Sequence, residues 1–191
     1  MRANPLSIVL GALFLAYPLL VYCGLMFSEP RVAALMLVLL ASTRFALVKP
    51  ATTNKGLAPR ITLALAAAMV IGFLALVTNS SDYLRFYPVC INALIFVLFF
   101  DSLLRPPSIV ERIARISEPG LSEAGVRYTR KVTKVWCGFF VLNGALALYT
   151  GISASLEVWA LYNGVISYAL IALLFAGEYL VRSWCRRREI L

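Results

Sequence analysis

The sequence contains no histidine, and only 14% of its residues are charged, against about a quarter in an average soluble domain. Its four cysteines form no Cys-x-x-Cys pair, so neither a zinc site nor a haem site is expected. A glycine-rich phosphate loop and a recognisable nucleophile motif are also missing. These absences leave no motif that supports an enzyme, and we expect no cofactor and no bound metal.

Apolar residues dominate instead. They make up 61% of the chain, and the mean hydropathy is +0.85. A bilayer-spanning helix needs roughly 20 mostly apolar residues, and lipid leaves no partner for an open backbone group. We therefore predict an all-α, polytopic membrane protein in which residues 1–191 form one transmembrane domain. Its six helices are expected at about 4–27, 31–48, 61–79, 84–104, 134–153 and 157–181.

The lysines and arginines predict how these helices are oriented. With the N-terminus placed in the cytoplasm, 16 of the 18 basic residues fall on the cytoplasmic side, and only Arg31 and Arg85 fall outside. Cytoplasmic loops collect Lys and Arg. Both termini are therefore expected in the cytoplasm, with the helices arranged as three hairpins. The net charge of +9 then reflects membrane orientation, and nucleic acid is not an expected partner.

The connection at about 105–130 is the largest predicted segment outside the membrane. Its stretch RPPSIVERIARISEPG begins with two prolines and ends in Pro-Gly, which favours a short helix at about 108–117. One face of this helix is apolar: Ile109, Val110, Ile113 and Ile116. The opposite face is charged: Glu111, Arg112 and Arg115. Such a helix is typical of the membrane interface.

A run of basic residues follows this connection. Four cations fall at i, i+3, i+4 and i+7, and so share one helix face: Arg127, Arg130, Lys131 and Lys134. We call this set the basic stripe. One interpretation is an anchor that contacts anionic lipid head groups. The other is a docking site for a phosphate or an acidic protein partner.

Isolated polar residues inside the predicted spans are candidates for function. Asn92, Asn143 and Asn163 lie in helices four, five and six. They either join helices through amide hydrogen bonds or line a path for a substrate. Pro18 and Pro88, each after a tyrosine, are expected to kink helices one and four.

Two carboxylates lie nearest the predicted bilayer. Asp101 and Glu178 each precede an arginine by four residues, Arg105 and Arg182, which favours local ion pairs. The alternative is a general acid–base pair for a transfer reaction, which makes these two residues the catalytic candidates.

Two stretches, EPGLSEAGVRYTRKVTKVWCGFFVLNGALAL and WALYNGVISYALIALLFAGEYLVR, carry a family resemblance, together with Tyr-Pro-x-x-x-Asn at 87–92. There the chain resembles small bacterial inner-membrane proteins of unassigned activity, encoded in aryl-polyene-type and related fatty-acid-like biosynthetic clusters. The likeness covers the C-terminal half well and the N-terminal half only in hydropathy. It implies a role in making, anchoring or moving an acyl product, and it supplies no catalytic residues.

Three functions follow as hypotheses. The first is a scaffold or accessory subunit at the inner leaflet, with the basic stripe docking an acidic acyl carrier protein or a ketosynthase-type subunit. The second is a small transporter or flippase for a lipid or acyl product. The third is a membrane-embedded transferase. Membrane lipids are expected partners in all three.

Overall fold

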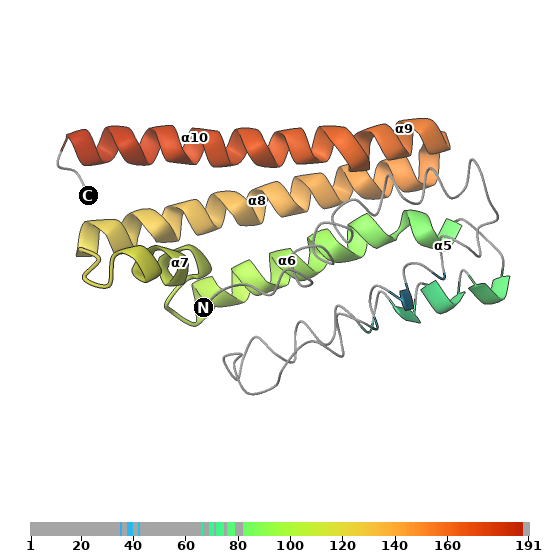
Figure 1. Ribbon diagram of the computed structural model, residues 1–191, viewed down its shortest axis with the longest axis horizontal. Helices are drawn as coiled ribbons and strands as arrows, with labels where there is room; N and C mark the ends of the chain where they lie inside the picture. The colour runs from blue at the N-terminus through green and yellow to red at the C-terminus, as the bar shows by residue number, and fades with distance from the viewer. Residues whose placement is uncertain are drawn as a thin grey trace. The chain divides into compact units, whose positions relative to one another are not determined.

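The computed structural model describes residues 82–188 continuously, together with scattered helical positions between 35 and 78. Every regular element in this described part is a helix (Figure 1). Three of its helical segments are long and apolar enough to span a membrane: Tyr83–Leu104, Glu123–Ser153 and Leu156–Arg187. They correspond to the predicted spans at 84–104, 134–153 and 157–181. The predicted helices at 4–27, 31–48 and 61–79, and with them Pro18, lie wholly or largely outside the described residues.

The first of these spans is broken near its start. Helix α5 covers Asp82–Arg85 and α6 covers Tyr87–Leu104, with a turn at Phe86 between them. Pro88 explains the break, because it has no N–H to donate to the preceding turn. It falls in the first turn of α6, where a missing N–H costs little. The kink predicted from Pro88 therefore takes the form of a break just before it.

The predicted short helix is present as α7, Ile109–Ser117. Ser108 caps it, its hydroxyl accepting a bond from the Glu111 N–H at 3.4 Å. The two predicted faces of α7 do not match its burial. Glu111, on the predicted charged face, is only 6% exposed, whereas Ile116, on the predicted apolar face, is 81% exposed. Arg115, one turn later, lies 2.9 Å from the Glu111 carboxylate and balances its charge. This local ion pair offsets the desolvation cost of burying the Glu111 carboxylate.

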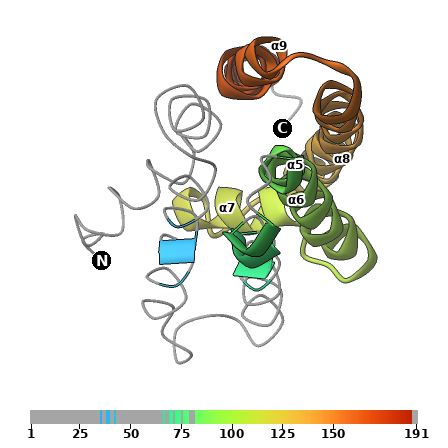
Figure 2. The ribbon, with the colours of Figure 1, turned by 90° about the vertical axis from the view of Figure 1, so that its right-hand side faces the viewer.

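Helix α8 runs over Glu123–Ser153, eleven residues earlier than the predicted span. A short connection capped by Ser155 leads to α9, Leu156–Leu161 (Figure 2). The chain continues as a π-helical turn, η1, at Tyr162–Ile166, and then as α10, Ser167–Arg187. Asn163 accounts for the wider turn, because its side-chain amide donates to the Trp159 carbonyl at 2.9 Å. In a regular α-helix the backbone N–H of residue 163 would take that carbonyl.

The described residues divide into two compact units. Unit 1 contains 82–91 and 144–166 of the continuous part, and unit 2 contains 92–143 and 167–188. In unit 1, Trp159 is fully buried and donates its indole N–H to the Arg85 carbonyl at 3.1 Å. Gly151 faces the same carbonyl oxygen, and a Cβ there would meet it at 3.5 Å, an ordinary van der Waals contact.

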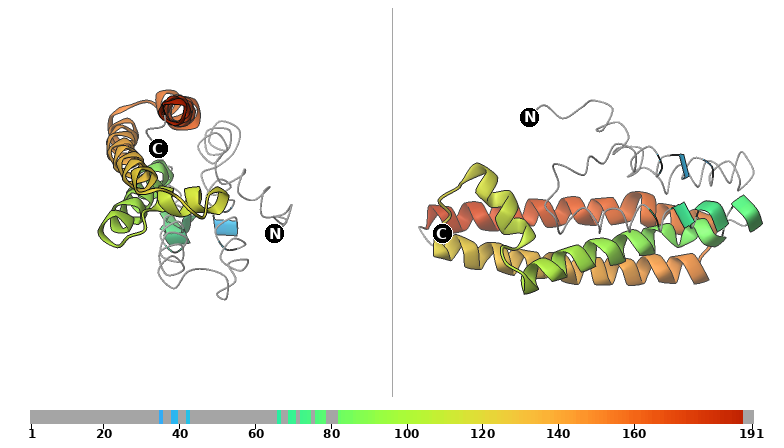
Figure 3. Two further views of the ribbon diagram at one scale, coloured as in Figure 1. Left: turned by 90° about the vertical axis from the view of Figure 1, so that its left-hand side faces the viewer. Right: turned by 90° about the horizontal axis from the view of Figure 1, so that it is seen from below.

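Unit 2 places its parts of α6, α8 and α10 side by side (Figure 3). Aromatic side chains join the three helices. Trp136 on α8 lies 6.4 Å from Phe99 on α6 and 4.7 Å from Phe175 on α10, between ring centroids. Phe140, one turn along α8, stacks on Trp136 at 5.6 Å. This cluster forms the floor of the cavity described next.

Candidate functional site

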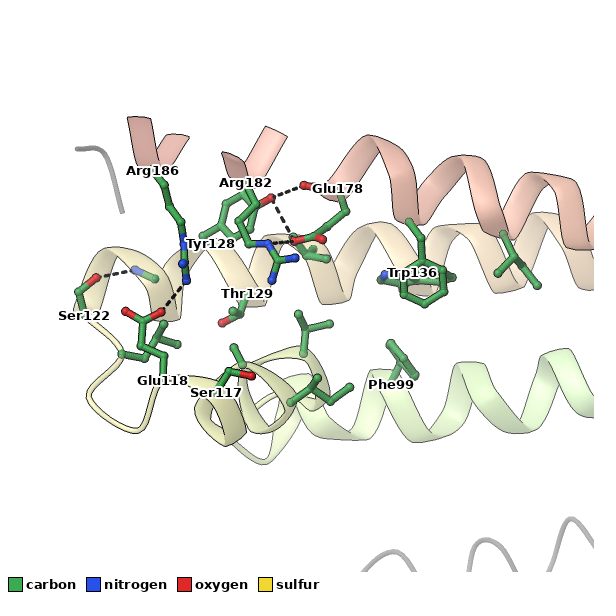
Figure 4. Close-up of a pocket in the computed structure, with 18 of the residues that line it drawn as sticks. Phe99, Ser117, Glu118, Ser122, Tyr128, Thr129, Trp136, Glu178, Arg182 and Arg186 are labelled. Atoms are coloured by element: carbon green, nitrogen blue, oxygen red, sulfur yellow. Dashed lines mark hydrogen bonds and ion pairs between the residues drawn. The ribbon is translucent and has the colours of Figure 1, made fainter. Parts of the chain in front are cut away.

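Unit 2 encloses a cavity of about 480 Å³, lined by residues from α6, α7, α8 and α10 (Figure 4). Small-molecule sites typically have volumes of about 300–1,000 Å³. The lining separates into two ends of different chemistry. The inner end is apolar and consists of Ile95, Phe99, Trp136, Phe140, Ile171 and Phe175.

The other end, which we call the mouth, is polar and charged. The Tyr128 hydroxyl lies 3.4 Å from the Glu178 carboxylate and 3.3 Å from the Glu178 carbonyl oxygen, and donates toward both. The Glu178 carboxylate also lies 3.4 Å from Nε of Arg182. Next to this group, the Arg186 guanidinium donates to Glu118 at 2.6 Å. The mouth thus holds two carboxylates and two guanidinium groups, each cation facing an anion.

The connection between α7 and α8 supplies one side of the mouth. Arg115 donates to the Pro119 carbonyl at 3.3 Å, and Ser122 caps α8 by accepting from the Gly125 N–H at 3.0 Å. At its other end, α7 is joined to α6 through Ser102, whose hydroxyl accepts from the Ile109 N–H at 3.0 Å. The Ser102 bond fixes the start of α7 against α6, and Val110 and Ile113 of α7 line the cavity.

The basic stripe is exposed on α8, as its spacing predicts, but its members differ. Arg127 forms an exposed ion pair with Glu123, at 3.7 Å. Arg130 donates to the Leu103 carbonyl at 3.2 Å and so satisfies one of the last carbonyls of α6. Lys131 and Lys134 are exposed to the surroundings. None of these four residues lines the cavity.

The three asparagines join helices. In unit 2, the Asn143 amide donates to Asn92 at 3.0 Å and to Ser167 at 2.9 Å, which links α8 to α6 and α10. In unit 1, Asn163 donates to the Thr150 hydroxyl of α8 at 3.2 Å. All three asparagines are buried, and none lines the cavity. Of the two alternatives predicted for these residues, the hydrogen bonds between helices are present. The other alternative, a substrate path lined by the asparagines, does not coincide with this cavity.

The two catalytic candidates occupy different surroundings. Each forms the predicted ion pair with the arginine four residues later: Asp101 with Arg105 at 3.7 Å, and Glu178 with Arg182 at 3.4 Å. Glu178 lines the cavity and Asp101 does not. The cavity therefore contains only one member of the hypothetical acid–base pair. Within residues 82–188, no group of three His, Cys, Asp or Glu side chains is placed to hold a metal ion.

Sequence reasoning missed most residues of the mouth. It found Glu178 and Arg182 as a local ion pair, but it did not extend the same four-residue spacing to Arg186. The run EYLVRSWCR places all three on one helix face at the polar end of α10, which was the available signal. Glu118 and Tyr128 gave no such signal, because their partners lie 68 and 50 residues away.

Comparison with known proteins supports the membrane assignment. No protein-family model matches the chain, and no solved structure matches it. Among curated proteins, it is 23% identical over 123 residues to the inner membrane-spanning protein YciB of Marinomonas sp. (strain MWYL1). The match covers 62% of this chain and 66% of that protein, just under two thirds of its length. Together with the three apolar spans among the described residues, this similarity identifies the chain as a multi-pass protein of the inner membrane. The resemblance to aryl-polyene-cluster proteins stays a prediction.

Proposed function

We propose that this protein binds a single-chain acyl amphiphile within the inner membrane, as an accessory component of an acyl-lipid pathway. The cavity of unit 2 carries the proposal, because its two ends match the two ends of such a molecule. Aromatic and aliphatic side chains at the inner end suit an acyl chain, and the polar mouth suits a head group. A site of this kind serves the transporter hypothesis as well as the accessory one, since both require the acyl product to be held.

Filling the cavity should remove this binding. Val132 lies on the cavity side of α8, one turn before Trp136, so Val132→Trp is expected to occupy the space of the chain. We expect affinity for lauric acid to fall at least about tenfold, or about 1.4 kcal/mol. Native mass spectrometry of the protein released from nanodiscs measures the bound fraction.

Val135→Trp is the matched control, because Val135 is on the same helix, is 55% exposed and does not line the cavity. It should bind lauric acid as the natural protein does. Equal binding by both variants, or no binding by the unaltered protein, would contradict the proposed function.

The exposed lysines of the basic stripe favour a second candidate, a scaffold that docks an acidic carrier protein at the inner leaflet. Lys131 and Lys134 are exposed and one turn apart, the geometry that electrostatic docking needs. The double variant Lys131→Glu, Lys134→Glu is expected to abolish co-purification of an acyl carrier protein without changing membrane insertion. Arg187→Glu with Arg188→Glu, a charge reversal of equal size at the last residue of α10 and the residue after it, is the control. Carrier protein retained by the stripe variant would refute this candidate.

A role for Glu178 as a catalytic base has less support. Its carboxylate oxygen Oε1 already accepts from Tyr128 and faces Arg182, and the second carboxylate of the hypothetical acid–base pair, Asp101, does not line the cavity. The arrangement favours binding over proton transfer.

A further inference from the structure

We infer that the amphiphile held in the cavity carries an anionic head group, a carboxylate or a phosphate, bound by Arg182 and Arg186. This inference rests on the proposed function and adds the chemistry of the ligand's polar end. The acyl chain alone would fit any lipid-like molecule, whereas the mouth discriminates between head groups.

The two arginines are placed as a pair. They lie four residues apart on α10, which puts their side chains on one helix face. Both line the cavity, and Figure 4 shows the Arg186 side chain reaching from α10 to Glu118 and the Arg182 side chain beside Glu178 and Tyr128. Their side chains are 42% and 58% exposed, so an incoming group can reach them.

Each guanidinium group has donors to spare. Arginine offers five N–H bonds in a fixed fork. Arg182 faces Glu178 through Nε, which leaves its terminal nitrogens for another acceptor. Arg186 faces Glu118 through one terminal nitrogen, Nη2, which leaves Nε and the other terminal nitrogen. A carboxylate or phosphate between the two side chains can therefore accept charge-assisted bonds from both.

The two carboxylates of the mouth differ in how firmly they are held. The Glu178 side chain is 17% exposed and receives the Tyr128 hydroxyl as well as Arg182. The Glu118 side chain is 48% exposed and faces an arginine that is itself 58% exposed. Exposed ion pairs of this kind contribute little. A ligand anion therefore replaces Glu118 at Arg186 more easily than it replaces Glu178 at Arg182.

This exchange also opens the mouth. Glu118 belongs to the connection between α7 and α8, and its bond to Arg186 joins that connection to α10. When the ligand anion also displaces Glu118 from Nη2 of Arg186, the connection is released from α10 at this point. Glu118 thus competes with the ligand, and removing its charge should strengthen binding.

The test compares lauric acid with monolauroylglycerol, which shares its chain and has no charge. The full-length protein in nanodiscs should bind lauric acid the more tightly. The double variant Arg182→Gln, Arg186→Gln should lose about tenfold in affinity for lauric acid, because hydrogen bonds to charged groups are the strong ones. Its affinity for monolauroylglycerol should stay within about twofold. Glu118→Gln should bind lauric acid about threefold more tightly.

The control alters an equivalent ion pair away from the cavity. Glu123 and Arg127 lie 3.7 Å apart on α8 and neither lines the cavity, so Glu123→Gln should change neither affinity. Lauroyl lysophosphatidic acid tests the phosphate form of the head group, and its tighter binding than monolauroylglycerol would support the inference equally.

Several results would overturn the inference. If lauric acid and monolauroylglycerol bind equally and the arginine variant changes neither, the proposed function stands and the head-group assignment fails. If neither amphiphile binds the natural protein, both fail together. Displacement of the bound amphiphile by acetate or inorganic phosphate, at the same concentration, would show a site for free anions instead. Should the arginine variant lose both ligands through misfolding, unchanged or weaker lauric acid binding by Glu118→Gln would still refute the inference.

Discussion

Replacing Trp136 with alanine is expected to lower the free energy of unfolding by about 3 kcal/mol, the low end of the range for truncating a buried tryptophan. Trp136 is 6% exposed and contacts aromatic rings on α6, α8 and α10. Lipid tails are as apolar as leucine, so the loss comes from packing contacts more than from transfer out of water. Reversible unfolding in bicelles, followed by circular dichroism, measures it.

The matched control is Leu142→Ala, on the same helix. Leu142 is 68% exposed, so lipid tails can replace the contacts that its side chain loses. We expect a change below about 0.5 kcal/mol. Equal destabilisation by the two variants would mean that the aromatic cluster does not hold the helices of unit 2 together.

We expect Asn143→Ala to lower the free energy of unfolding by about 1–2 kcal/mol, the second large effect. The variant removes hydrogen bonds to both Asn92 and Ser167, and so weakens the contact of α8 with α6 and with α10. No water is available in the hydrocarbon to replace them. The same unfolding assay applies.

Ligand binding separates the two interpretations of Asn143. Because it does not line the cavity, Asn143→Ala should retain lauric acid binding at temperatures where the protein stays folded. A folded variant that no longer binds or moves the amphiphile would instead place Asn143 on the ligand's path, as the transporter hypothesis first suggested.

Local chemistry explains what could be predicted from the sequence. The bounds of α7 follow from Ser108, which caps its start, and from Pro-Gly after its end. The ion pairs of Asp101 and Glu178 follow from their four-residue spacing, which brings both members together on any helix. The later spans follow from hydropathy and length alone.

The cavity could not be predicted in the same way. The cavity depends on how each helix is rotated about its axis. The apolar residues of α6 are spread over all of its faces, so its sequence does not indicate which face points inward. Tyr128 meets Glu178 only because α8 and α10 present those faces to each other. The burial of Glu111 could not be predicted either, because a charged residue is expected on the outward face of a helix. Its ion pair with Arg115 allows it to be buried.

The length of α8 has a consequence for how the cavity exchanges its occupant. Its 31 residues extend for about 46 Å at about 1.5 Å per residue, whereas the hydrocarbon layer is about 30 Å thick. All charged residues of α8 precede residue 135, and the uncharged remainder of the helix, 135–153, includes Trp136. The mouth therefore stands at the depth of the lipid head groups, with the aromatic floor among the acyl chains. A lipid already in that leaflet could enter sideways without crossing water, and occupancy would then follow its mole fraction in the leaflet, not its aqueous solubility.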